Sequence, residues 1–210
     1  NVIPAGTPFA LRVFGHKEAD ACRTDLEIPV AALEGKAVSA KIQTIEAMNL
    51  AKTPIAASLG MVKQDLAGIS GPVTVVLLTD GEETCEGDPR AAIEDLRQAG
   101  FDVRVNIVGF AINELALKEQ FEAWARVGNG RYIEAHDRDE LQDAINRSLD
   151  VPFEVLQGDD VVATGVVNGE PVALLPAAYQ VRLLGSAPRD LGEVQIEARV
   201  EVDLRADGAE

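Results

Sequence analysis

The sequence predicts an α/β fold class: a doubly wound, mostly parallel sheet followed by a small all-β domain. Three observations predict it, namely the almost unbroken apolar run Val73–Leu78, the helical periodicity between such runs, and the change to short strands after residue 150. Buried parallel strands are near-continuous aliphatic runs, and alternating strands and helices build a parallel sheet with right-handed crossovers. We therefore expect one domain over 1–150 and a second over 151–210.

Each element of the first domain is predicted from its apolar pattern. Thr53 and Pro54 begin the second helix, so Thr53 is expected at or beside an N-cap, and Asp88 with Pro89 opens the third. Only 4% of the residues are aromatic, so the core must be aliphatic. The expected strands are 9–14, 25–30, 73–78, 103–110 and 132–135, and the expected helices lie near 38–45, 53–66, 88–100, 117–128 and 141–149.

The second domain is predicted to be a small antiparallel β unit, with a sandwich as the expected architecture. Apolar residues alternate with polar ones from Val194 to Leu204, a pattern typical of a strand with one buried face. Shorter strands are expected at 161–167, 172–175 and 179–184. No helical pattern is present after residue 151.

Composition excludes some partners. The formal net charge of −16 argues against nucleic acid, because phosphate binding depends on Lys and Arg. It suits cations or basic protein surfaces, but acidity is also a common route to solubility, which is the interpretation that the charge alone favours. No stretch reaches the ~20 apolar residues that a membrane span requires.

Two cysteines, Cys22 and Cys85, lack CxxC spacing and a nearby histidine, which argues against zinc. They are either two buried thiols or one disulfide, and the residues alone leave that choice open. A disulfide would close a loop of roughly 60 residues, worth about 4 kcal/mol in the chain-entropy model.

Two side chains are placed where ligands of parallel sheets gather, beyond the carboxyl ends of the strands. Asp80 directly follows the central strand, and Thr53 begins a helix whose loop faces the same rim. Each has a plain structural alternative: Thr53 as a helix cap, and Asp80 with Gly81 as a turn.

Other polar residues give weaker indications. Glu82 and Glu83 suggest acid/base chemistry, but adjacent side chains diverge and no nucleophile accompanies them, which favours a solvated acidic loop. His16 and His136 stand alone in loop-like sequence, which favours surface or hydrogen-bonding roles over catalysis. No catalytic residue is assigned.

The segment Val75–Thr84 (VVLLTDGEET), together with Lys52–Ile55, resembles the von Willebrand factor type A domain. The likeness extends from Phe9 to Leu149, and it is greatest to bacterial members with TDGEETC after the fourth strand. The resemblance implies a metal-ion-dependent adhesion site for Mg²⁺, or for Mn²⁺ or Ca²⁺, in which Thr53 and Asp80 are ligands. A carboxylate of a partner protein would complete the coordination, with Glu82 and Glu83 as possible contacts at the rim.

The sequence departs from the family's pattern in one respect. No DxSxS segment occurs, although the family takes further metal ligands from it. The strand that precedes that segment lies, in the family, between the strands expected here at 9–14 and 73–78. We therefore expect an incomplete cation site and two unpaired sheet edges. The central strand is then either cut away from this sequence or supplied by another chain or a second copy.

The resemblance also bears on the cysteines and on function. Bacterial relatives carry both cysteines, which implies a Cys22–Cys85 disulfide and an extracytoplasmic location, whether periplasmic, secreted or at the cell surface. The expected function is a non-enzymatic protein-binding, adhesion or scaffold module. The alternatives are a metal-independent structural interaction module, a metal-assisted hydrolase, and a cytoplasmic form with free thiols that assists an ATPase.

Overall fold

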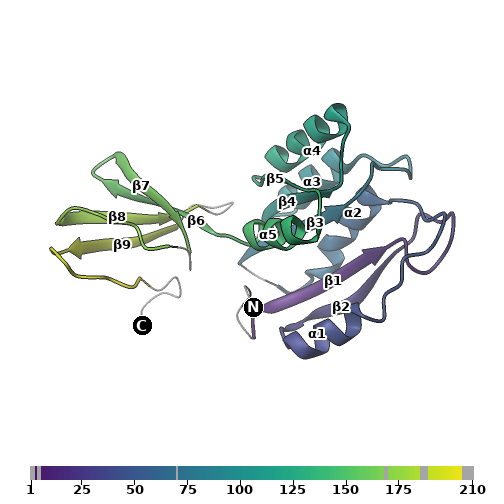
Figure 1. Ribbon diagram of the computed structural model, residues 1–210, viewed down its shortest axis with the longest axis horizontal. Coiled ribbons are helices and arrows are strands. Elements are labelled where there is room, and N and C mark those ends of the chain that lie inside the picture. The colour runs from purple at the N-terminus through teal and green to yellow at the C-terminus, as the bar shows by residue number, and fades with distance from the viewer. Residues whose placement is uncertain (1–2, 4–5, 70, 168–169, 185–188, 205–210) are drawn as a thin grey trace. The chain divides into compact units, whose positions relative to one another are not determined.

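The computed structural model describes residues 3, 6–69, 71–167, 170–184 and 189–204 (Figure 1). The chain divides into two compact units, Asn1–Leu149 and Asp150–Glu210, and each is described by itself.

A three-stranded parallel sheet forms the centre of the first unit, as the sequence predicts. Its strands are β3 (Pro72–Thr79), β4 (Asp102–Phe110) and β5 (Tyr132–Ala135), in the order β3-β4-β5. Valine and isoleucine fill β4, whose interior is almost entirely buried. The helices that accompany this sheet are α2 (Ile55–Asp65), α3 (Pro89–Gln98), α4 (Leu115–Val127) and α5 (Arg138–Ser148).

Helices cover both faces of this sheet. Val75 and Leu77 of β3 pack into a cluster with buried residues of α2, α3 and α4, whereas Val76 packs with Ala144 of α5 on the other face. Successive strand residues point to opposite faces, so both faces of β3 need an apolar covering. The first cluster consists of Ile55, Leu59, Leu77, Ile93, Val103, Val105, Ile107, Ile112, Phe121, Trp124 and Ala125.

A separate antiparallel pair, β1 (Pro8–Phe14) and β2 (Thr24–Ala32), precedes α1 (Gly35–Ile42). Within the described residues β1 pairs only with β2, and β3 pairs only with β4, so the edges of β1 and β3 are both unpaired. No residue of β1 is fully buried, although its sequence PFALRVF is mostly apolar. Helix α2 contacts β1, β2 and α3, and it therefore bridges the two sheets.

Polar contacts reinforce this bridge. The Arg12 guanidinium donates two hydrogen bonds of 2.7 Å to the Asp65 carboxylate at the end of α2. The Ser58 hydroxyl of α2 lies 3.0 Å from the Thr24 hydroxyl of β2. A bidentate arginine–carboxylate pair fixes direction as well as distance, so β1 is oriented by α2 without any strand pairing to β3.

The second unit is a single antiparallel sheet in the described residues. Its strands are β6 (Pro152–Gln157), β7 (Asp160–Val166), β8 (Ala177–Leu183) and β9 (Arg189–Ile196), in the order β7-β6-β8-β9. The sandwich expectation is wrong here. Its apolar face carries Val155, Tyr179 and Val181, and the loop residue Leu174 packs against it in place of a second sheet.

Two strand predictions for this unit also need correction, and a further strand went unpredicted. β6 was not predicted, and residues 172–175 form no strand. The predicted long strand to Leu204 ends at Ile196, because the chain turns at Arg199, whose φ is +64°. Val200, Val202 and Leu204 keep their alternation but lie outside the sheet, each more than a third exposed.

Candidate functional site

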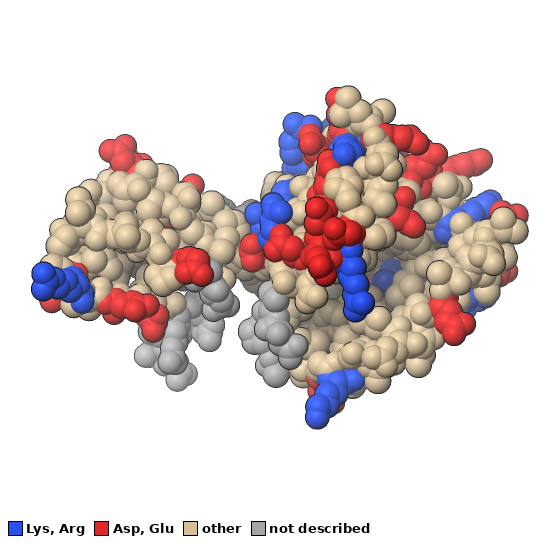
Figure 2. Space-filling model, in the orientation of Figure 1, with Lys and Arg blue, Asp and Glu red and all other residues tan. Residues whose placement is uncertain are grey.

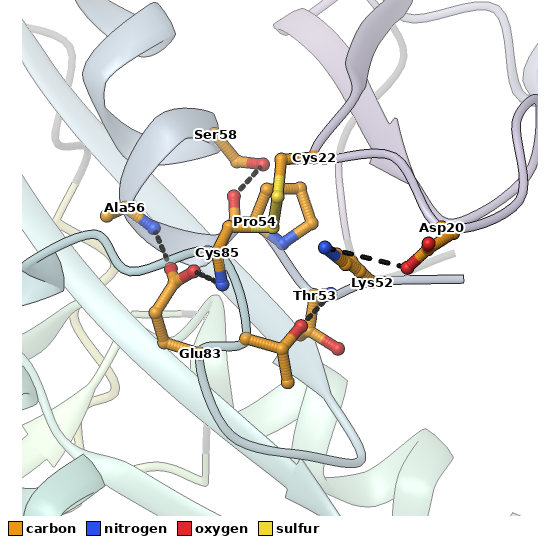
Figure 3. The surroundings of a disulfide bond; sticks show 10 residues. Asp20, Cys22, Lys52, Thr53, Pro54, Ala56, Ser58, Glu83 and Cys85 are labelled. Carbon is orange, nitrogen blue, oxygen red and sulfur yellow. Dashed lines mark hydrogen bonds and ion pairs between the residues drawn. A yellow bond between two sulfur atoms is a disulfide. The ribbon is translucent and has the colours of Figure 1, made fainter. Parts of the chain in front are cut away.

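The candidate site is the loop rim at the carboxyl end of β3, and a disulfide holds it. Cys22, in the loop between β1 and β2, is bonded to Cys85, in the loop between β3 and α3 (Figure 3). Their Cα atoms are 5.7 Å apart and 63 positions separate them in sequence. The disulfide implied by the resemblance is therefore present, and it joins loops that belong to two different sheets.

Thr53 lies on this rim and pairs with the same loop. Its backbone N–H donates to the Thr84 hydroxyl at 2.7 Å, and the Thr84 N–H donates back to the Thr53 carbonyl at 3.2 Å. Helix α2 begins at Ile55 with Pro54 in the N-cap position, so Thr53 lies beside the N-cap, as expected, rather than at it. Thr53 serves instead to align the two loops beside the disulfide.

Glu83 is the residue that satisfies the start of α2. One carboxylate oxygen accepts from the Ala56 N–H and the other from the Cys85 N–H, both at 2.7 Å (Figure 3). An anion at a helix N-terminus also interacts favourably with the helix dipole. A solvated loop is thus a correct description of the exposed Glu82 but not of the half-buried Glu83. Sequence reasoning missed this cap because it spans 27 positions and has no local motif.

Asp80 stands at the tip of the turn that ends β3. The Thr79 hydroxyl donates to the Gly81 carbonyl at 2.9 Å, which closes the turn and leaves Asp80 exposed. Neither Asp80 nor Glu82 makes a hydrogen bond or ion pair with any described residue. Both carboxylates are therefore available to a ligand.

The donor set at the rim suits a hard cation in kind but not in number. Thr53 offers a hydroxyl oxygen and Asp80 a carboxylate, the ligand types that Mg²⁺ or Ca²⁺ prefers. Such ions take about six or more oxygen ligands, and these two residues supply only a fraction of them. The residues described here do not form a complete cation site.

A different cluster, which sequence reasoning missed, lies on the β1–β2 hairpin. His16, Asp25 and Glu27 place potential ligand atoms within 4.8 Å of one another. The Glu27 carboxylate, however, is already contacted by Lys17, by Lys41 at 2.6 Å and by His16 at 2.8 Å. Hydrogen bonds from Lys17, Lys41 and His16 hold the pKa of Glu27 far below its usual range.

Two ammonium groups beside the Glu27 carboxylate would repel a metal cation, so this cluster is an ion-pair network. The two histidines have different surroundings. His16 is a hydrogen-bonding residue with a side chain only 6% exposed, whereas the His136 side chain is 51% exposed and lies 3.4 Å from Glu134. Neither has the partners of a catalytic triad among the residues described.

No helix in the described part of the chain combines the length and apolar character needed to cross a bilayer. No protein-family model matches the sequence. The chain is 34% identical over 153 residues to the uncharacterized protein YwmD of Bacillus subtilis, an alignment that covers 68% of this chain and 67% of YwmD. It is 38% identical over 92 residues to the uncharacterized protein YwmC of the same organism, covering 43% and 39%.

One solved structure shows a likeness of fold, and a second gives a lower score. Proximal thread matrix protein 1 from the mussel byssus superimposes with a TM-score of 0.53 at 18% identity, covering 69% of this chain and 36% of that one. An aerotolerance-related membrane protein from Bacteroides fragilis gives a TM-score of 0.45 at 22% identity, covering 62% and 75%.

Proposed function

The chain belongs to the same family as YwmD of Bacillus subtilis, and we propose that it is a non-enzymatic protein-binding module of the von Willebrand factor type A kind. Its binding surface is the rim formed by the loops that carry Thr53 and Asp80. The module serves adhesion or scaffolding, and its partner is another protein.

One observation supports this proposal above others: the rim is rigidly built, yet its outermost carboxylates have no partner. The disulfide, the Thr53–Thr84 pairing and the Glu83 cap fix three loop segments. Asp80 and Glu82 remain exposed on this fixed frame. Preorganised loops lose little conformational entropy on association, and a rigid scaffold that presents loop residues is a common design for binding.

In this proposal, binding of a cation depends on the partner protein. Thr53 and Asp80 would hold a divalent cation such as Mg²⁺ only with added oxygen ligands, one of them a partner carboxylate. We therefore expect Mg²⁺ alone to leave the melting temperature of this chain unchanged. A clear increase in melting temperature with Mg²⁺, abolished in Asp80→Ala, would mean that the chain binds the cation without help.

The open edges of β1 and β3 support a second element of the proposal, in which another chain or a second copy supplies a strand between them. Both edges are unpaired within the described residues, and α2 contacts β1 and β2 while Ile55 and Leu59 of α2 share an apolar cluster with Leu77 of β3. An edge strand offers a row of free N–H and C=O groups to an added strand. Amide exchange tests this: edge amides of β1 and β3 should exchange quickly in the isolated chain and slowly in a complex.

The disulfide supports an oxidising, extracytoplasmic compartment. Protein alkylated without reductant directly in its native cells should carry no label on Cys22 or Cys85. Labelled thiols would instead favour the cytoplasmic alternative.

Binding at the rim is tested with a random peptide library displayed on phage, using the whole chain as bait. Ligands selected in Mg²⁺ are then measured against the wild type, Asp80→Ala and Glu119→Ala. The control residue Glu119 is an exposed carboxylate of α4, away from the rim loops in sequence. Loss of affinity in Asp80→Ala alone supports the proposal, whereas equal affinity in all three proteins contradicts it.

A metal-independent interaction module is the second candidate, favoured by the small donor set at Thr53 and Asp80. Binding that persists in EDTA but is lost in Asp80→Ala would identify it. Turnover of an ester or phosphate substrate that disappears in Asp80→Ala would point instead to a hydrolase.

A further inference from the structure

The rim carries an apolar residue in an unusual state. Leu50, in the loop before Thr53, is 84% exposed and has a φ of +60°. A bulky side chain in the left-handed region is strained, and Asn or Gly is the usual occupant of such a position. Burial gives Leu50 no compensation, so neither backbone preference nor core packing accounts for leucine here.

The surrounding contacts hold Leu50 in place. Its carbonyl accepts a hydrogen bond of 2.9 Å from the Asp20 N–H, and the neighbouring Met48 N–H donates to the Gly15 carbonyl at 3.0 Å. Asp20 is also paired with Lys52 at 3.5 Å (Figure 3). Because Asp20 lies two residues before Cys22, the disulfide anchors the segment that positions Leu50. The loop is thus held by hydrogen bonds, an ion pair and the nearby disulfide, while the Leu50 side chain is exposed to solvent.

The acidic loop that contacts the same segment, three residues after Leu50, indicates the charge of the partner. Residues 80–88, which reach Thr53 through the Thr84 contact, contain five carboxylates and no Lys or Arg. Two of the five are occupied as helix caps, Glu83 on α2 and Asp88 on α3. The remaining three, Asp80, Glu82 and Glu86, have no partner among the described residues. A surface that combines a projecting apolar side chain with unpaired acids fits a basic protein surface with an apolar pocket.

A second copy of this chain fits poorly as the partner that binds the rim. Every copy carries a net charge of −16, and acidic side chains are spread over the visible face of both units (Figure 2). Rim-to-rim association would bring the two acidic loops together at an energetic cost.

We infer that Leu50 is the apolar anchor of the rim and that it inserts into an apolar pocket on a partner protein, bordered by Lys and Arg that face residues 80–88. This inference rests on the proposed protein-binding function and names the partner's chemistry. In many interfaces a few side chains that become fully buried in a pocket carry most of the affinity.

The decisive variant is Leu50→Asn, which removes the apolar side chain and suits the left-handed backbone. Its melting temperature should equal or exceed that of the wild type, by up to a few degrees. If Leu50 instead stabilised the fold, its replacement would lower the melting temperature. A lower melting temperature of Leu50→Asn therefore overturns the inference. Leu175→Asn is the matched control, because Leu175 is a leucine 80% exposed in the other unit.

Binding is measured with peptides selected from the random displayed library by the wild-type chain. The enriched sequences should combine large apolar residues with Lys or Arg. Leu50→Asn should weaken their binding at least about tenfold, while Leu175→Asn leaves it unchanged. Selection of acidic or purely polar sequences, of ligands indifferent to Leu50, or of no ligand at all overturns the inference.

Two further comparisons distinguish a failure of the Leu50 inference from a failure of the proposed function, and a protein partner from a lipid surface. Loss of binding in Asp80→Ala but not in Leu50→Asn leaves the proposed function standing and removes Leu50 from it, whereas loss in neither removes both. Phosphatidylcholine vesicles test a lipid surface, and flotation of the wild type but not Leu50→Asn with them would overturn the assignment to a protein partner.

Discussion

Cys22 and Cys85 form a covalent link between two sheets that share no strand pairing in the described residues. Cys22 follows β1 and Cys85 follows β3, the two strands whose edges are open. The bond therefore does more than shorten the unfolded chain. It keeps the loops of the antiparallel pair beside those of the parallel sheet, and the rim depends on that alignment.

Removal of the disulfide should destabilise the first unit strongly. The loop of 63 positions corresponds to about 4 kcal/mol in the chain-entropy model. A Cys22→Ser, Cys85→Ser double variant should lose stability of that order in urea unfolding, and reduced wild-type protein should behave like it. Equal stability before and after reduction would show that α2 and its contacts suffice to hold the sheets together.

Glu83 should matter more than its neighbour Glu82. Glu83→Ala leaves the N–H groups of Ala56 and Cys85 without their acceptor and should lower the free energy of unfolding by about 1–3 kcal/mol. Glu82→Ala is the control, since that side chain is exposed, and it should change stability by less than about 0.5 kcal/mol. Equal effects in urea unfolding would refute the cap.

Acid should weaken the hairpin network around Glu27. Lys17, Lys41 and His16 lower the pKa of Glu27, so the folded state favours its ionised form. The resulting stabilisation is present above the ordinary glutamate pKa and is lost as the pH falls towards the lower folded value. Glu27→Gln should therefore be less stable than the wild type at neutral pH, and the difference should shrink on acidification.

The control for that experiment is Glu18→Gln, whose side chain is 60% exposed and lies 3.7 Å from Arg23. It should show little difference at either pH. Urea midpoints at neutral and acidic pH give the comparison, and a Glu27→Gln deficit that stays constant across that range would contradict the network.

Tyr132 carries a buried hydroxyl without a hydrogen-bond partner in the described structure. Burial, with smaller effects from Glu134 and Glu122, raises the pKa of Tyr132 to about 12. The folded state thus resists ionisation, and stability is lost as the pH rises above the ordinary tyrosine value near 10.

Tyr132→Phe removes both the unpaired hydroxyl and this alkaline sensitivity. Its stability at neutral pH should match or exceed that of the wild type, because an unsatisfied buried polar group is costly. The ring at position 132 would still pack against Phe121, since the centroids of the Tyr132 and Phe121 rings are 5.8 Å apart. Thermal unfolding at neutral and alkaline pH provides the measurement, and marked destabilisation at neutral pH would indicate a hidden partner for the hydroxyl.

Much of the first unit could be predicted because its signals are local. The aliphatic run of β3 and the Asp88–Pro89 start of α3 each depend on neighbouring residues, and the structure places both as predicted. The sequence predicts β1 and β2 only as two short runs, and their antiparallel pairing comes from the structure. The second unit was harder, because alternation from Val194 to Leu204 does not reveal the turn at Arg199 that ends β9.

The candidate site divides in the same way. The sequence by itself determined that Asp80 follows the central strand and that Thr53 lies at the start of a helix whose loop faces the same rim, since the carboxyl ends of parallel strands share one edge of a sheet. Only the tertiary structure decided that Glu83 rather than Thr53 satisfies the start of α2, that His16 is buried against Glu27, and that Leu50 projects from a braced loop. These three depend on contacts between residues distant in sequence, and side-chain burial and hydrogen bonding across such distances leave no periodic trace in the chain.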